Sequence, residues 1–87
     1  MKITTRQAFE KDALKLPLKT QREIAIVILA IQNAGKLSEI KSCKKLTGFK
    51  NAYRIRIGNY RIGFFFEDDT VELVRVLARK DMYRFFP

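Results

Sequence analysis

The segment that most constrains the fold is YRIRIGNYRI at residues 53–62. Apolar and basic residues alternate on both sides of Gly58-Asn59, and this dipeptide has the composition of a two-residue hairpin turn. Antiparallel pairing around the turn sets Arg56 opposite Arg61 on one face and makes the other face apolar. The predicted pairs on the apolar face are Ile57 with Tyr60, Ile55 with Ile62 and Tyr53 with Phe64.

A short strand and a short helix are predicted near the N-terminus. Residues 2–4 alternate weakly, as in a strand. Phe9, Ala13 and Leu16 follow at helical spacing with polar residues between them, which predicts an amphipathic helix. Pro17 disfavours helical geometry in the residue before it, so this helix should end near Leu16.

A second helix is predicted over about residues 18–34. Thr20 with Glu23 three positions later is a capping-box pattern, and Gly35 suits a left-handed C-cap. This helix has two apolar faces, because Ile26 and Leu29 lie nearly opposite the main stripe. We expect the first helix to cover Ile26 and Leu29, and the alternative is that a partner chain covers them. The main stripe, which should cover the sheet, consists of Ile24, Val27, Ile28 and Ile31.

The C-terminal half should form an antiparallel sheet. A basic loop at residues 41–45 leads to a turn at Gly48 and then to the hairpin, whose second strand should end at Phe66. An acidic turn at residues 67–69 precedes a last strand at 71–77. In that strand we place Val74 and Val76 in the core and turn Arg75 toward the arginine face, which avoids burying a charge.

The predicted fold class is therefore α+β, in one domain over residues 1–87. A short N-terminal strand should be followed by a helical hairpin packed on one face of a twisted antiparallel sheet, and a short C-terminal segment should end the chain. With 47% hydrophobic residues, the chain is apolar enough to form a packed core.

The charge of the chain points to a polyanionic partner. Eighteen Lys and Arg residues against nine Asp and Glu give a net charge of +9, which attracts nucleic acid or an acidic protein. Cys43 is the only cysteine, so no internal disulfide can form, and a reducing compartment, the cytoplasm, is expected. With no histidine and one cysteine, a zinc site is nearly excluded and histidine acid-base chemistry is excluded outright, and we expect no metal, no cofactor and no membrane association.

The hairpin brings Arg54, Arg56 and Arg61 onto one face. Like charges placed directly across a ladder are destabilising, so stability alone does not favour this arrangement. A phosphodiester would relieve the repulsion, because guanidinium groups bind phosphate through two parallel hydrogen bonds. The alternative is a solvated face on which the arginines spread apart in water.

The sheet half, KKLTGFKNAYRIRIGNYRIGFFFEDDTVELVRVLARKDMYRFF, resembles the RelE/ParE toxin superfamily. The most specific pieces are YRIRI, the turn followed by NYRI, and the terminal RKDMY. In the ribonuclease branch of the family, such residues line the active groove. The resemblance thus implies ribosome-dependent, metal-independent mRNA cleavage, in which the 2′-hydroxyl of the RNA attacks the adjacent phosphate. The implied catalytic residues are Arg54, Arg56, Arg61, Arg79 and Tyr83.

The roles implied for these residues differ. Arg61 and Arg79 suit stabilisation of negative charge. Tyr83 could stack on a base or act in proton transfer, and the alternative is that it caps the sheet. The general base stays open between a lysine such as Lys80 and an arginine that acts only electrostatically, since arginine stays protonated far above neutral pH. Phosphate-binding residues are predicted to be Lys44, Lys45, Lys50, Arg75 and Lys80.

Two rival functions remain. The gyrase-directed branch of the superfamily inhibits by binding, and the arginines in place of the strand lysines of many ribonucleases favour it. A basic nucleic-acid-binding module without toxicity is the other. Either toxin interpretation implies an acidic antitoxin, with Ile26 and Leu29 as partner-binding residues. We expect the free toxin to be monomeric and its complex to be of higher order.

Overall fold

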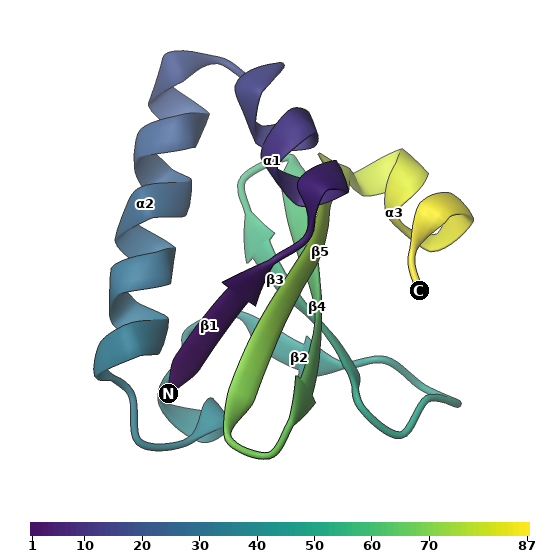
Figure 1. Cartoon of the computed structure of the whole chain (residues 1–87). Coiled ribbons are helices and arrows are strands. Elements are labelled where there is room, and N and C mark those ends of the chain that lie inside the picture. Colours follow the sequence, from purple (N-terminus) through teal and green to yellow (C-terminus); the bar gives the residue numbers. More distant parts are fainter.

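The computed structural model describes all residues from Met1 to Pro87, and the predicted α+β class is confirmed (Figure 1). Its sheet has the order β1-β5-β4-β3-β2, in which β1 is parallel to β5 and the other pairs are antiparallel. None of the helices has the length and apolar character needed to span a lipid bilayer. The elements are β1 (Lys2–Thr5), α1 (Gln7–Leu14), α2 (Leu18–Asn33), the 3-10 helix η1 (Leu37–Glu39), β2 (Cys43–Lys45), β3 (Ala52–Ile57), β4 (Tyr60–Glu67), β5 (Thr70–Ala78) and α3 (Arg79–Phe85).

The central hairpin has the predicted register. Arg56 pairs with Arg61 and Ile57 with Tyr60, so Gly58 and Asn59 form the two-residue turn. Gly58 has a φ of +54°, which glycine adopts without the steric cost that a Cβ would add. The apolar side of the hairpin lies in the main core, where Ile55, Ile62 and Phe64 are almost completely buried.

Helix α2 covers this apolar face, but its ends are formed differently from the prediction. It begins after Pro17 with no side-chain cap, and Thr20 is buried in its first turn, so the predicted capping box is wrong. Its last residues lead into an extended Ala34, and Gly35 does not adopt the left-handed conformation expected of it. The amino group of Met1 instead donates hydrogen bonds to carbonyls of the last turn, at Ile31, Gln32 and Ala34.

The outer face of α2 is not covered by α1. Ile26 is 68% exposed and Leu29 is 57% exposed, so the expectation that the first helix covers them is wrong. Helix α1 lies instead beside β5, where Phe9 enters the main core.

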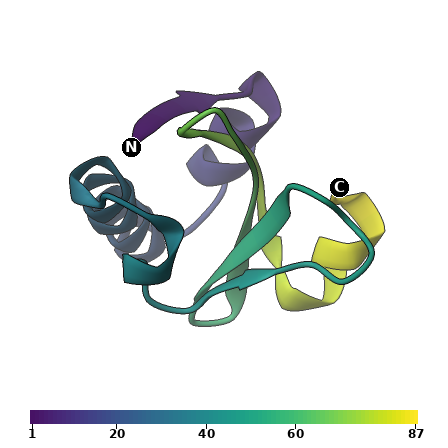
Figure 2. The same ribbon diagram turned by 90° about the horizontal axis from the view of Figure 1, so that it is seen from below.

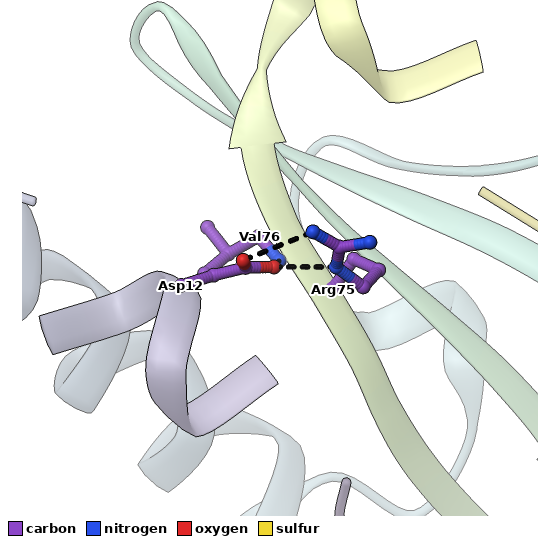
Figure 3. Close-up of polar contacts among 3 residues, drawn as sticks. All are labelled: Asp12, Arg75 and Val76. Carbon is purple, nitrogen blue, oxygen red and sulfur yellow. Dashed lines mark hydrogen bonds and ion pairs between the residues drawn. The ribbon is translucent and has the colours of Figure 1, made fainter. Parts of the chain in front are cut away.

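Asp12 of α1 attaches this helix to the edge of β5 (Figure 3). Strand β1 pairs with β5 only as far as Leu73, so β1 provides no hydrogen-bond partner for the backbone N–H of Val76, further along β5. The Asp12 Oδ2 atom accepts a hydrogen bond from that N–H at 3.2 Å and another from Arg75 Nε at 2.7 Å. The Asp12 Oδ1 atom accepts a third from the terminal guanidinium nitrogen of Arg75 at 3.1 Å. One carboxylate thus satisfies an open sheet edge and a neighbouring cation.

A bulge in β5 moves Val74 to the sheet face opposite the predicted one. Gly63 pairs with Arg75 and Phe64 with Leu73, which leaves Val74 as the extra residue. Val74 and Val76 are both buried, as predicted, but they lie on opposite faces of the sheet. Val76 joins the main core, whereas Val74 joins a second cluster.

The second cluster lies under α3, on the sheet face opposite α2 (Figure 2). Met82 and Phe86 of the C-terminal segment are buried there against Leu46, Ala52 and Val74. Phe86 lies directly on Gly63, where an added Cβ would come within 2.6 Å of the ring. The short C-terminal segment is therefore a helix that covers part of the arginine face.

Candidate functional site

The uncovered part of the second sheet face carries a cluster of cations, which we call the arginine cluster: Arg54, Arg56, Arg61 and Arg79. Arg56 lies directly opposite Arg61 in the ladder, and Arg54 is two residues along the same strand. The backbone N–H of Arg79 donates to the carbonyl of Asn59 at 2.9 Å, which fixes the start of α3 beside the hairpin turn. Four catalytic candidates named from the sequence are thus brought together.

The electrostatics of Arg61 confirm this proximity. Partial burial and the positive charges of Arg54, Arg79 and Arg56 lower the pKa of Arg61, whereas Tyr83 raises it. The side chain is held by hydrogen bonds from its guanidinium to the carbonyls of Gly58 and Tyr60, at 3.0 and 2.9 Å. The neighbouring arginines destabilise the positive charge of Arg61, and a bound anion would offset this repulsion.

No carboxylate neutralises the arginine cluster. The ion pairs of the protein are Arg6 with Glu72 and Arg75 with Asp12, and neither includes a residue of the cluster. Burial raises the pKa of the Cys43 thiol, and the nearby Arg54 only partly offsets this effect. Cys43 is therefore a protonated thiol and supplies no anion to the cluster.

Strand β2, where the sequence predicted only a basic loop, extends the cationic surface. Lys44 pairs with Arg54 across the ladder, so their side chains share one face. Lys45 follows Lys44 on the same exposed edge strand, and Lys50 lies in the exposed loop that leads back to β3. Lys44 therefore extends the arginine cluster, whereas Lys45 pairs with Tyr53 and lies on the other face of the sheet, and Lys50 belongs to the loop beyond β2.

Tyr83 lies between two hollows of this surface. It is 69% exposed, so the alternative that it caps the sheet is wrong, and Met82 and Phe86 do so instead. One hollow is lined by Tyr83, Asn59, Ala78, Arg79 and Lys80. The other is lined by Tyr83, Lys44, Lys45, Leu46, Thr47, Phe49 and Arg54.

Arg75 lies on the predicted face of the sheet, because it pairs with Gly63, which in turn pairs with Arg54, but its guanidinium is not part of the arginine cluster. Its guanidinium is bound by Asp12 and lies over the ring of Phe85, 5.8 Å from the centroid. The hydrogen bond to Asp12 raises the pKa of Arg75, with a smaller opposing effect of burial. Helix α1 thus gives Arg75 a structural partner that strand alternation could not reveal.

Two contributors to the surface were missed in the sequence. Phe49 stands between Gly48 and Lys50, and an aromatic residue in this basic loop was an available signal. Gly63 interrupts an apolar strand, and a glycine inside a strand often marks a site of close approach. Its partner Phe86 belongs to a segment for which no helix was predicted.

Similarity to known proteins identifies the family. No protein-family model matches the chain. Toxin RelE3 of Methanocaldococcus jannaschii, however, is 41% identical over 88 residues that cover all of both proteins. The chain belongs to the RelE toxin family. The resemblance to RelE/ParE toxins is thereby confirmed.

Solved structures of RelE toxins have the same fold. A chain in the crystal structure of the RelB-RelE antitoxin-toxin complex from Methanococcus jannaschii matches with a TM-score of 0.82 and 39% identity, over 97% of this chain and 99% of that one. A chain of the archaeal RelE-RelB complex from Pyrococcus horikoshii OT3 matches with a TM-score of 0.73 over 93% of this chain and 97% of that one. That second match has 19% identity and concerns the fold alone.

Proposed function

We propose that this RelE-family toxin cleaves messenger RNA on the ribosome, in the cytoplasm and without a metal or other cofactor. The observation that carries the proposal is the unneutralised arginine cluster around Arg61, next to the exposed ring of Tyr83. Such a surface attracts phosphodiesters and offers a ring on which a base can stack.

In the proposed reaction, the 2′-oxygen of one nucleotide attacks the adjacent phosphorus and the bond to the 5′-oxygen breaks. The 2′-hydroxyl proton is removed, another proton is delivered to the leaving oxygen, and the products carry a 2′,3′-cyclic phosphate and a 5′-hydroxyl group. The phosphorane between these states has additional negative charge, which oriented cations stabilise. We assign that role to Arg61 and Arg79.

The remaining residues of the surface have supporting roles in this proposal. Arg54 and Arg56 bind the phosphate that is cut, and Tyr83 stacks on a neighbouring base. Lys80 shares a hollow with Arg79 and Tyr83, and we assign removal of the 2′-hydroxyl proton to the unprotonated amine form of its side chain, which becomes an ammonium group in this step. Guanidinium groups stay protonated far above neutral pH and are poor bases. Phosphates flanking the cut are bound by Lys44, Lys45 and Lys50.

The test is cleavage of mRNA on purified translating ribosomes, with magnesium limited to the amount that keeps the ribosomes assembled. The wild-type toxin should produce new 5′ ends at defined positions, and Arg61→Ala or Arg79→Ala should slow cleavage by about 100- to 1000-fold. Both variants should remain folded. Arg79 is exposed, and substituting an exposed arginine changes stability by about 0.5 kcal/mol or less. Arg61 is half-buried, but its removal also relieves the repulsion from the neighbouring arginines.

The matched control is Arg22→Ala, an exposed arginine on α2 that should leave cleavage unchanged. Absence of cleavage by the wild-type protein, together with inhibition of gyrase supercoiling, would replace this proposal by the gyrase-directed one. Unfolding of Arg61→Ala or Arg79→Ala would show that these arginines are structural.

We also propose an acidic antitoxin as the partner of this toxin. The Methanococcus jannaschii structure with 39% identity is an antitoxin-toxin complex, and the net charge of +9 suits an acidic chain. Ile26 and Leu29, exposed on the outer face of α2, offer an apolar strip for an amphipathic segment of that chain. We expect a free monomer and a complex of higher order.

A further inference from the structure

We propose that Phe49 and Tyr83 form a second base-binding subsite for single-stranded RNA, separate from the hollow that contains Arg79. Both rings line one hollow, and its charged lining residues are Lys44, Lys45 and Arg54. No acidic side chain lines it. This inference rests on the proposed function, since it assigns a place to a nucleotide beside the one that is cut.

Phe49 is an exposed aromatic side chain with no partner in the protein. It is 48% exposed, and neither its ring nor that of Tyr83 pairs with another aromatic ring or a guanidinium group. Phe85 is similarly exposed, at 51%, but the guanidinium groups of Arg75 and Arg84 lie over it. Packing therefore accounts for Phe85 and leaves Phe49 free to bind a ligand.

The loop that carries Phe49 is held in place at its base. The Leu46 side chain is buried in the second cluster, and its N–H donates to the carbonyl of Ala52 at 2.9 Å. The Phe49 N–H donates to the carbonyl of Leu46 at 3.4 Å. Gly48, with a φ of +87°, turns the chain between them. The turn between β2 and β3, which carries Phe49, is thus anchored at its base and extends beyond the sheet (Figure 1).

The chemistry of the hollow selects single-stranded RNA as its ligand. Every base has a flat face that stacks on an aromatic ring, and each nucleotide carries a phosphate that lysine and arginine bind. A base in a duplex is already stacked on its neighbours, whereas a base in a single strand is available. Phe49 and Tyr83 supply the rings, and Lys44 and Arg54, which share one face of the sheet, supply the phosphate contacts.

The experiment measures binding of a labelled 2′-O-methyl RNA oligonucleotide, which lacks the attacking hydroxyl, by fluorescence anisotropy. Phe49→Ala should weaken binding by about 5- to 100-fold, the range expected for one stacked base, and Phe49→Tyr should restore it. Phe85→Ala, which removes an equally exposed ring outside the hollow, should bind as the wild type does.

Salt dependence separates stacking from charge. Lys44→Ala should reduce the slope of log affinity against log salt by about 0.7, the value for one phosphate contact in a single strand. Phe49→Ala should leave that slope unchanged. One abasic position in the oligonucleotide should weaken the wild type but not Phe49→Ala, because the stacking contact is already absent in the variant.

The subsite would be overturned if the wild type and Phe49→Ala bound the oligonucleotide with equal affinity. It would also be overturned if Phe49→Ala weakened binding of an acidic antitoxin peptide but not binding of the oligonucleotide. These results are distinguishable from failure of the proposed function. Ribosomal cleavage by Phe49→Ala at the wild-type rate and positions would overturn the subsite while the function stands. Phe49-dependent RNA binding without ribosomal cleavage would support the subsite while the proposed function fails.

Discussion

Gly63→Ala should disturb both stability and activity through one contact. A Cβ at this position would lie 2.6 Å from two atoms of the Phe86 ring, closer than packed carbon atoms approach. Phe86 is only 2% exposed, so the ring cannot move aside without leaving the second cluster. Overpacking of this kind costs about 1 to 3 kcal/mol, against a gain of about 0.4 to 1 kcal/mol from the stiffer unfolded chain.

A net loss of about 1 to 2 kcal/mol should lower the thermal midpoint by roughly 5 to 15 °C in a chain of this length. Helix α3 carries Tyr83 and Arg79, and its packing on the sheet positions both side chains. A shift of α3 should therefore also slow mRNA cleavage, even at a temperature where the variant is folded. Gly35→Ala is the matched control, since its nearest neighbour, a Glu39 carboxylate oxygen, would lie 3.6 Å from the new Cβ. Gly35→Ala should leave the thermal midpoint unchanged or raise it slightly.

A double-mutant cycle isolates the contact. Phe86→Ala alone should cost about 3 to 5 kcal/mol, as for other buried phenylalanines. In that background the methyl group added at position 63 has room, so combining it with Gly63→Ala should cost little more. A Gly63→Ala protein with the wild-type midpoint and cleavage rate would refute the argument that Phe86 holds α3 in place.

Two further changes test other parts of the structure. Asp12→Asn should lower the free energy of unfolding, measured with denaturant, by about 3 kcal/mol. The reason is that the Arg75 charge and the Val76 N–H lose their shared carboxylate. Glu10→Gln on the same helix should change the free energy of unfolding by less than about 0.5 kcal/mol. An unchanged midpoint in Asp12→Asn would show that the edge contact contributes nothing. Leu29→Asp should leave the free toxin folded, since Leu29 is 57% exposed, yet it should speed dissociation of the antitoxin in surface plasmon resonance. The control is Ser38→Asp, an exposed position in η1 outside α2, which should not change dissociation. Unfolding of the free Leu29→Asp toxin would place Leu29 in the core and remove it from the partner surface.

The parts of the fold that could be predicted from the sequence are those fixed by neighbouring residues. Alternation around Gly58-Asn59 determined the register of β3 and β4, because a two-residue turn allows only one pairing that buries all the apolar residues. The same register placed Arg54, Arg56 and Arg61 together without knowledge of any other element. The extents of α1 and α2 followed from helical spacing and Pro17, although the capping interactions did not.

The parts that could not be predicted depend on contacts between distant segments. The bulge at Val74 exists where Gly63 faces two residues of β5, and strand alternation alone contains no sign of it. Val74 was placed on the wrong face for that reason, and the pairing of Arg75 with Asp12 was missed because the two residues are 63 positions apart in the sequence. The helical C-terminus and the three-residue strand β2 are too short for a periodic pattern to establish.

The structure also shows why the arginine cluster and α3 occur on the same face. Gathering the cations of the cluster beside Lys44 destabilises the fold, and the apolar contacts of the main core lie on the opposite side of the sheet. The second cluster supplies apolar burial beside the cations, and it does so with the helix that carries Arg79 and Tyr83. The residues that stabilise this face therefore also orient the proposed catalytic groups. An antitoxin that neutralises the cluster and an RNA phosphate would remove the same repulsion, so the two ligands should compete for the toxin even where their contacts do not overlap.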